Sequence, residues 1–417
     1  MLRARHGLVL AVLGLLVVAT VMVNSASLNL SGRAPTTTES VFWGKHTWFA
    51  LGAMAALAVG CMVPVERLGT SGKRWWSTPV TWVAAVALLG LLLVHVPGIG
   101  REANGARRWI TLGPVGLQPS ELAKWGVPIV LAWYCIRERA RMGSFIRGFA
   151  LPLAAVSAVC GIIAIEDLGT AVLIELVAVA MLVAAGARWW FAAALAPVGL
   201  VAFAGLVIAS PYRVNRIAAF LNPYEDARGI GYHIIQSLEA ISGGGLAGRG
   251  LGNSELKFGY LPEATTDFIY SIVTEELGIT GAILVVALYV MLILGGLAIL
   301  ASATRRSSAA GPAGTPLLPG FSQLLGYGII LTVGLQALIN IAVVTGLAPT
   351  KGIALPLMSR GGTGWILTCL SLGMVVAMDR AADRTRRALG EPIPGESDDV
   401  ASAEVSAGTA DGVAGIA

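Results

Sequence analysis

The chain has 417 residues, of which 56% are hydrophobic and 13% are charged, and its mean hydropathy is +0.75. Soluble domains carry roughly 45–50% apolar and 25% charged residues, so the composition excludes an ordinary soluble enzyme and predicts an integral membrane protein. The formal net charge of +5 is attributed to membrane topology, and nucleic acid is not an expected partner.

Ten apolar segments are each long enough, or nearly so, to cross ~30 Å of hydrocarbon. They lie near 8–27, 47–65, 79–100, 118–136, 147–165, 170–187, 189–210, 269–300, 322–345 and 362–379. We therefore expect an all-α integral membrane protein with about ten transmembrane helices. The first segment has no small-residue cleavage site, so it is interpreted as a retained helix.

Basic residues predict the orientation of these segments. They gather before the first segment and after the second, fourth, eighth and tenth, as in Arg3, Arg137 and Arg380. Cytoplasmic connections are rich in Lys and Arg, so an even number of spans places both termini in the cytoplasm. The long connection between spans seven and eight then faces outward.

Composition also divides the chain. Residues 1–388 are predicted to form one polytopic membrane domain. Residues 389–417 are rich in Ala, Gly, Ser, Glu and Asp, which predicts a disordered cytoplasmic tail. The four cysteines have no paired spacing and are expected to be packing residues.

The stretch from Tyr212 to Gly281 interrupts the apolar pattern with charged, aromatic and glycine-rich pieces. Loops of this length are usually functional or disordered, and this one has too many large apolar residues for disorder. We expect an outer catalytic loop over about 211–268. Glycines around Arg249 suit an anion-binding nest, although glycines also serve simple turns.

Cations stand at two unexpected places, in the outward connection between the third and fourth spans and just inside the fourth span. Arg101, Arg107 and Arg108 are interpreted as contacts to an anionic partner or to lipid headgroups. Lys124 is predicted about one turn inside the helix that starts at Pro119. It either pairs with Glu121 along the helix or contacts a phosphate or pyrophosphate.

Carboxylates stand at three further positions where ionisable groups are costly. Asp167 either caps the sixth span or orients a cation or a substrate hydroxyl. Asp267 is predicted in the first turn of the eighth span, where the helix dipole stabilises an anion, and it is equally suited to act as a general base. Glu275 or Glu276 is expected to face a polar interior or to pair with a base.

The connection from Gly346 to Trp365 contains Lys351 and Arg360 and several Gly and Pro residues. Irregular backbone at this depth must be covered by protein or by water-filled space, so an ordered loop is predicted. The sequence contains no phosphate-loop lysine motif, no His-Glu-x-x-His motif and no Asp-x-Asp motif. A nucleotide cofactor is therefore not expected.

In these places the sequence resembles the SEDS family (shape, elongation, division and sporulation). The resemblance covers most of residues 1–388. It is carried by the motifs NGARRWI, LGPVGLQPSELAK, EDLGTA, RGIGYHIIQSLEAISGGGLAGRGLGNSELKFGYLPEATTDFIYSIVTEELG and APTKGIALPLMSRGGTG. The run Pro349-Thr350-Lys351-Gly352 is more similar to the division member of the family than to the elongation member.

The resemblance implies an inverting glycosyltransferase that polymerises lipid II into peptidoglycan at the outer face of the bacterial cytoplasmic membrane. It implies a role in septal wall synthesis during cell division, with wall synthesis during elongation as the alternative. The expected partners are lipid II, the polyprenyl-linked glycan, a class B penicillin-binding protein and divisome proteins. Two other classes stay open: a lipid II transporter, and a non-catalytic scaffold for a transpeptidase.

The resemblance also implies roles for single residues. Asp267 is the expected general base that removes the acceptor proton. A divalent cation, Mg²⁺ or Mn²⁺, is a further expectation, with Asp167 as its possible ligand. Residues of the matching motifs are expected to bind substrate: Arg101, Arg107, Arg108, Gln118, Lys124, Asp167, Lys257, Glu263, Lys351 and Ser359.

Overall fold

The structure is a computed structural model, and it describes residues 4–27, 44–70, 76, 78–97, 99–103, 106–112, 115–309, 319–360 and 362–388. The predicted tail at 389–417 lies outside the described residues, as do residues 310–318 in the connection between the eighth and ninth predicted spans.

A helix occupies each of the ten predicted segments. These helices are α1 (Ala4–Ser27), α3 (Lys45–Gly60), α5 (Pro79–Leu93), α6 (Pro119–Arg137), α7 (Leu151–Glu166), α8 (Leu168–Ala184), α9 (Trp189–Ile208), α12 (Ile269–Ala309), α13 (Phe321–Val344) and α14 (Gly362–Ala388). Among the described residues, six helices are long and apolar enough to cross a membrane. The chain is thus a multi-pass membrane protein by composition, while the ten-span topology stays a prediction.

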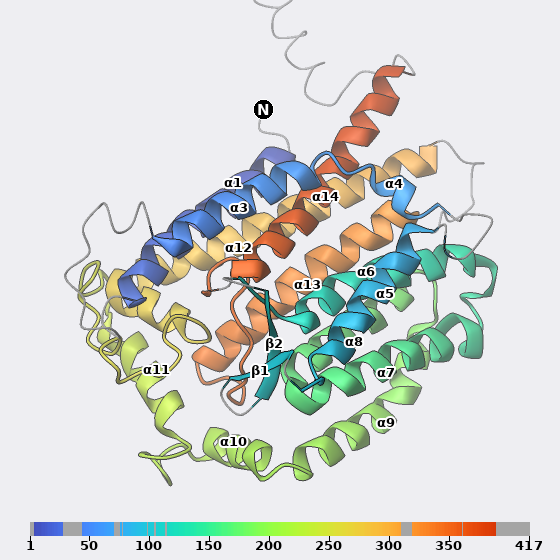
Figure 1. Cartoon of the computed structure of the whole chain (residues 1–417). Coiled ribbons are helices and arrows are strands. Elements are labelled where there is room, and N and C mark those ends of the chain that lie inside the picture. Colours follow the sequence, from blue (N-terminus) through green and yellow to red (C-terminus); the bar gives the residue numbers. More distant parts are fainter. Residues whose placement is uncertain are drawn as a thin grey trace, which may run out of the picture.

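The helices pack in pairs that are mostly distant in the chain. α1 lies along α12, α3 lies along α14, and α13 packs against α6, α8 and α12 (Figure 1). Small residues permit the closest of these approaches: a Cβ added to Gly60 of α3 would lie 2.2 Å from the Leu370 carbonyl oxygen. Nη1 of Arg5 lies 2.8 Å from Asp383, so the start of α1 and the last part of α14 meet at the same end of the molecule.

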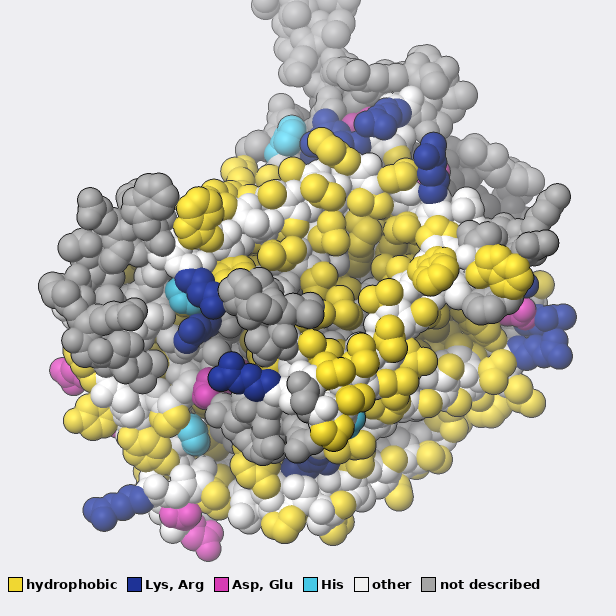
Figure 2. Space-filling view, in the orientation of Figure 1, with side chains coloured by type: hydrophobic (Ala, Val, Ile, Leu, Met, Phe, Trp, Pro, Cys, Tyr) yellow, Lys and Arg dark blue, Asp and Glu magenta, His cyan; other side chains and the backbone are white. Residues whose placement is uncertain are grey.

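α9 is the exception to this packing. Only 6% of the residues in its most apolar 18-residue stretch are buried. Three of its side chains are each more than two thirds exposed: Leu200, Val201 and Ile208. In Figure 1 it runs along the lower margin of the bundle, beside α10 (Pro211–Leu221). Figure 2 shows a broad hydrophobic area across one face of the molecule, with Lys and Arg side chains mainly toward its margins. This distribution suits a surface surrounded by lipid.

The connection before α6 folds as a sheet, which corrects the all-α prediction. Strands β1 (Gly100–Ala103), β2 (Ala106–Leu112) and β3 (Val115–Leu117) are antiparallel in the order β1-β2-β3. Arg101 stands opposite Trp109, and Ile110 stands opposite Leu117. The run RRWITL combines aromatic and β-branched residues, which favour strands, and two short connections allow it to pair locally.

The long connection between α9 and α12 contains two helices, α10 and α11 (Tyr232–Gly243). Its glycine-rich part wraps around a break in α12, where Gly278 adopts φ 68° and ψ −163°. The backbone N–H groups of Arg249 and Gly250 donate to the carbonyls of Glu275 and Glu276. Carbonyls left without helical partners by the break are thereby satisfied, and these N–H groups serve protein carbonyls in place of an anion nest.

Candidate active site

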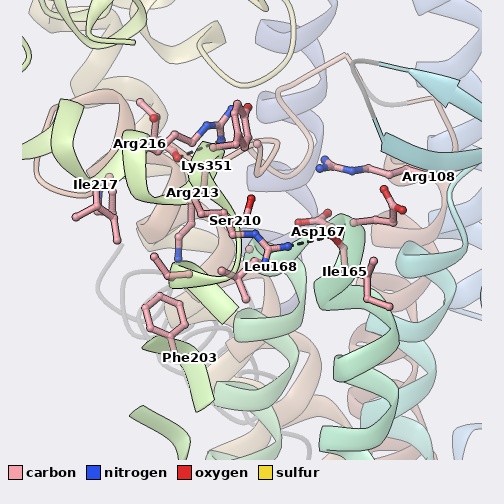
Figure 3. A pocket seen from close by; sticks show the side chains of 17 residues that line it. Arg108, Ile165, Asp167, Leu168, Phe203, Ser210, Arg213, Arg216, Ile217 and Lys351 are labelled. Atoms are coloured by element: carbon pink, nitrogen blue, oxygen red, sulfur yellow. Dashed lines mark hydrogen bonds between the residues drawn. The ribbon is translucent and has the colours of Figure 1, made fainter. Parts of the chain in front are cut away.

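A cavity of about 430 Å³ opens between the ends of several elements. Its walls come from β2, the junction of α7 and α8, the end of α9, the start of α10 and the 349–352 segment. Figure 3 shows Arg108 reaching toward the cavity from the side of the sheet, with Arg213 and Arg216 on the side of α10. The ionisable residues of the wall are Arg108, Glu166, Asp167, Tyr212, Arg213, Arg216 and Lys351. The cations outnumber the carboxylates, so the cavity is suited to an anion.

Asp167 forms the N-cap of α8, as one of the two sequence interpretations predicted. Its carboxylate accepts hydrogen bonds from the backbone N–H of Thr170 at 3.0 Å and from the Thr170 hydroxyl at 2.8 Å. The side chain is buried at the cavity wall. Its negative charge therefore has a fixed place, opposite the cations of α10.

Arg213 and Arg216 hold α10 against this wall. Arg213 donates to the Ala164 carbonyl at 2.6 Å and to the Leu206 carbonyl at 2.9 Å, so it joins the ends of α7 and α9. Arg216 donates to the Thr350 carbonyl at 3.1 Å. These two arginines were not among the residues predicted from the sequence. Their spacing of three on a short amphipathic helix after Pro211 was the available signal.

Lys351 completes the positive side of the cavity. Its Nζ lies 5.3 Å from the centre of the Phe203 ring, a cation–π contact with α9. Burial lowers the pKa of Lys351, and the negative charge of Asp167 acts in the opposite direction. Lys351 is thus placed where an anionic group in the cavity would favour its protonated form.

Asp267 lies in the turn that leads into α12, two residues before the helix begins. A Cβ added to Gly352 would lie 3.2 Å from Oδ2 of Asp267 and 3.9 Å from Nη1 of Arg108. A side chain at position 352 would be tight against this carboxylate, and Gly352 itself lines the cavity, so Asp267 stands at the edge of the cavity. Asp167 and Asp267, distant in the chain, therefore share one electrostatic environment.

The charge state of Asp267 is set by this environment. The pKa of Asp267 is raised from 3.8 to about 7, mainly by burial and also by the negative charges of Glu263 and Asp167. Arg216 and Arg108 oppose the increase. A carboxyl group that titrates near neutral pH is well matched to general base catalysis, as expected for the predicted role.

His233 packs against Phe268, the residue that follows Asp267, and was given no role from the sequence. Its ring stacks on Phe268, with centroids 6.0 Å apart and an interplanar angle of 10°. Burial lowers the pKa of His233, and Arg216 adds to this effect. Nδ1 is buried and has no hydrogen-bond partner among the described residues.

Lys124 and Glu121 form the intrahelical pair that the sequence suggested. Nζ of Lys124 lies 2.7 Å from Glu121 and 3.0 Å from Oε1 of Gln336. Lys124 is buried, and Gln118 occupies the N-cap position of the same helix. This pair is one of the two alternatives that the sequence offered. Lys124 is not among the residues that line the cavity, so its contact with a phosphate stays a prediction.

Lys257 is placed away from the cavity, in a buried network beneath the glycine-rich loop. Its Nζ lies 2.9 Å from Glu276, 2.6 Å from the Gly252 carbonyl and 3.2 Å from Ser25 of α1. Both charged side chains are almost fully buried. Glu275 pairs with the neighbouring Arg249 at 3.6 Å. The predicted pairing of Glu275 or Glu276 with a base is confirmed, and the contacts of Lys257 favour a structural role over the predicted substrate contact.

The other predicted residues are spread around the site. Ser359 is buried and accepts a hydrogen bond from the Leu355 N–H at 2.6 Å, which indicates a loop-stabilising role. Glu263 is exposed, has a φ of 57° and accepts from the Thr266 hydroxyl at 2.6 Å. Arg101 is exposed on β1. Arg107 belongs to β2, and its side chain lies outside the described residues.

A metal centre built by the protein alone is not evident in the part of the chain that the structure describes, where no group of three His, Cys, Asp or Glu residues could hold an ion. Mg²⁺ often binds through one or two carboxylates together with substrate phosphates. Asp167 at the cavity wall suits that arrangement, so the fit depends on a phosphate-bearing ligand.

The chain was compared with known proteins. The model of the FtsW/RodA/SpoVE family, described as cell cycle proteins, matches residues 6–384. A relative from Aromatoleum aromaticum, named probable peptidoglycan glycosyltransferase FtsW, is 39% identical over 90% of this chain and 88% of its own. Stage V sporulation protein E of Bacillus subtilis is 37% identical over 89% of this chain and 96% of its own.

Solved structures show the same similarity. A chain from a peptidoglycan synthase complex that coordinates polymerization and crosslinking matches with a TM-score of 0.57 and 28% identity, covering 88% of this chain and 97% of its own. The rod shape determining protein RodA of Thermus thermophilus matches with a TM-score of 0.54 and 25% identity, covering 90% and 96%. With the family model matching almost the whole length, the chain belongs to the FtsW/RodA/SpoVE family.

Proposed function

We propose that this chain is a peptidoglycan glycosyltransferase that polymerises lipid II into glycan strands. The observation that carries the proposal is the cavity itself. It joins Arg108, Arg216 and Lys351 to the edge where Asp267 stands, and the pKa of Asp267 is raised to about 7. Names of relatives support the same activity.

The reaction needs a base and an anion site on opposite parts of one cavity. Asp267 accepts the proton of the 4-hydroxyl group of the acceptor N-acetylglucosamine. That oxygen forms a bond to the anomeric carbon of the donor sugar, and the bond from this carbon to the diphosphate breaks with inversion. The lipid diphosphate leaves as an anion, so it requires charge stabilisation more than a strong acid.

The cations of the cavity are suited to that stabilisation. Arg108 and Arg216 lie in a half-buried setting, where electrostatic attraction is stronger than in bulk water. Guanidinium groups match the geometry of phosphate oxygens. A divalent cation held by Asp167 and the diphosphate would neutralise further negative charge, and this cation remains a proposal that chelation by EDTA tests.

The biological setting belongs to the same proposal. Pro349-Thr350-Lys351-Gly352 and the names of relatives favour septal synthesis during cell division. The chain matched in a peptidoglycan synthase complex supports partnership with a class B penicillin-binding protein in the divisome. We place residues 1–388 as the membrane domain in the bacterial cytoplasmic membrane, both termini and the 389–417 tail in the cytoplasm, and the 211–268 connection outside.

Polymerisation by purified protein tests the proposal. Wild-type protein in detergent or vesicles, supplied with lipid II, is expected to form glycan strands that a muramidase digests. The rate is measured with and without a class B penicillin-binding protein, and with and without EDTA. Translocation of lipid II in sealed vesicles without polymer formation would contradict the proposal and indicate a transporter.

A further inference from the structure

A buried polar stripe runs along α13 through an otherwise apolar helix. Thr332, Gln336 and Asn340 follow each other at intervals of four residues, and their exposed fractions are 1%, 5% and 1%. This spacing places them on one face of the helix. Buried polar groups in a membrane helix are costly unless they are hydrogen-bonded, so the partners of this stripe indicate why it is there.

Gln336 joins a charged side chain to the 349–361 loop. Its Oε1 accepts a hydrogen bond from Nζ of Lys124 at 3.0 Å, and its Nε2 donates to the Ala354 carbonyl at 2.7 Å. Lys124 belongs to α6, whereas Ala354 belongs to the segment between α13 and α14. Three parts of the chain meet at this amide.

Asn340 makes the corresponding connection one turn further along. Its Nδ2 donates to the Ile353 carbonyl at 2.7 Å and to the Asp267 carbonyl at 2.9 Å. Its Oδ1 is buried without a hydrogen-bond partner among the described residues. Reversing the amide would place that oxygen against two carbonyl oxygens, so the hydrogen-bond pattern determines its orientation. The two N–H groups therefore carry the polar function of this side chain.

The two amides act on neighbouring carbonyls of one loop, Ile353 and Ala354. One amide reaches Lys124 and the other reaches the backbone of Asp267. Four residues of an α-helix span ~6 Å and are rigid, so α13 provides a fixed spacing between these two contacts.

We propose that Gln336 and Asn340 are positioning residues of the active site, with Gln336 holding the Lys124 ammonium and Asn340 holding the backbone of Asp267. This inference rests on the proposed function. Neither side chain needs to contact the reacting atoms. Because Lys124 is expected to bind the anionic substrate and Asp267 to take the proton, the two amides should affect different steps.

The experiment compares three single variants. Gln336→Leu removes the Lys124 contact, and Asn340→Leu removes both donors that face Asp267 and Ile353. Thr332→Val is the matched control, because it removes a buried polar group from the same stripe whose hydroxyl donates only to the local Gly328 carbonyl at 2.7 Å. Thermal unfolding in detergent identifies which variants are folded, and kcat, KM and lipid II affinity are measured for those.

Asn340→Leu is expected to lower kcat about 10-fold to 100-fold with little change in KM, since a displacement near 1 Å can cost that much. Gln336→Leu is expected to weaken lipid II binding and raise KM about 10-fold, with a smaller change in kcat. Thr332→Val should keep both constants near the wild-type values. The inference would be overturned by folded Leu variants that keep wild-type constants. It would also be overturned if both variants lowered kcat and raised KM to the same extent.

Asn340→Asp provides a second measurement, which also serves if Asn340→Leu does not fold. An additional carboxyl group close to Asp267 opposes its ionisation, so the acidic limb of the pH–rate profile should move to higher pH. An unchanged limb together with a wild-type kcat would overturn the positioning role of Asn340. Wild-type protein and Asp267→Asn are assayed in parallel. An inactive wild type counts against the proposed function, whereas lipid II binding still decides the role of Gln336.

Discussion

Two regions of this molecule contain charged side chains away from bulk solvent. They differ in whether other protein groups pair with those charges. In the network beneath the glycine-rich loop, Lys257 and Glu276 are paired at 2.9 Å and almost fully buried. In the cavity, Arg108, Arg216 and Lys351 face an open volume, and Nε of Arg108 is buried without a hydrogen-bond partner among the described residues. Ions already matched by protein partners stabilise a fold, and ions facing a cavity are available to a ligand.

The largest expected effect is on the base itself. Asp267→Asn keeps the size of the side chain and removes its ability to accept a proton. General base catalysis contributes about 10²-fold to 10⁴-fold, so polymerisation should fall by that factor while lipid II binding persists. The control is Asp226→Asn in the connection between α9 and α12, where Oδ2 accepts a hydrogen bond from the Ile230 N–H at 3.1 Å. Wild-type turnover by Asp267→Asn would remove Asp267 from the mechanism.

Breaking the buried ion pair of Lys257 and Glu276 should lower the stability of the fold. Lys257→Met leaves Glu276 buried without its cation, which costs about 3–5 kcal/mol and should lower the thermal midpoint of unfolding. Replacing both partners, Lys257→Met with Glu276→Leu, should recover much of this loss because no unpaired ion remains. A stable single variant that has lost only lipid II affinity would reverse our assignment and return Lys257 to the substrate site.

The charged residues around the cavity should determine how the polymerisation rate depends on pH. Asp267 must be deprotonated to act as a base, so the rate should fall as pH decreases through about 7. Arg216 lowers the pKa of Asp267. Arg216→Gln should therefore raise that pKa and move the acidic limb to higher pH, in addition to weakening lipid II binding. Arg139→Gln, which changes an arginine of the short turn after α6, is the control and should leave the limb unchanged.

The smallest expected effect is a shift of the acidic limb to lower pH, opposite to that of Arg216→Gln. Glu263 raises the pKa of Asp267 through its negative charge, and its side chain is exposed. Glu263→Gln should move the acidic limb to lower pH, by less than one pH unit because solvent screens the interaction. A shift to higher pH, or a large increase in KM alone, would indicate that Glu263 contacts substrate directly.

Several features could be predicted because they depend on local pattern. Pro119 begins α6 as expected, and Asp167 caps α8 through Thr170. The sheet at 100–117 was missed because its strands are short and lie between apolar segments, where the helical pattern dominated the interpretation. Arg213 and Arg216 were missed because nothing in the local sequence shows that α10 folds back onto the end of α7.

The sequence by itself determined the membrane class, the positions of the apolar helices and the family to which the motifs belong, since these depend on composition and on short-range spacing. Tertiary structure decided which charged residues work together. Lys257 forms a buried ion pair with Glu276, whereas Arg216 lies close enough to Asp267 to lower its pKa. The reason is physical: the role of a charge depends on its burial and on its partners, and those partners come from distant parts of the chain.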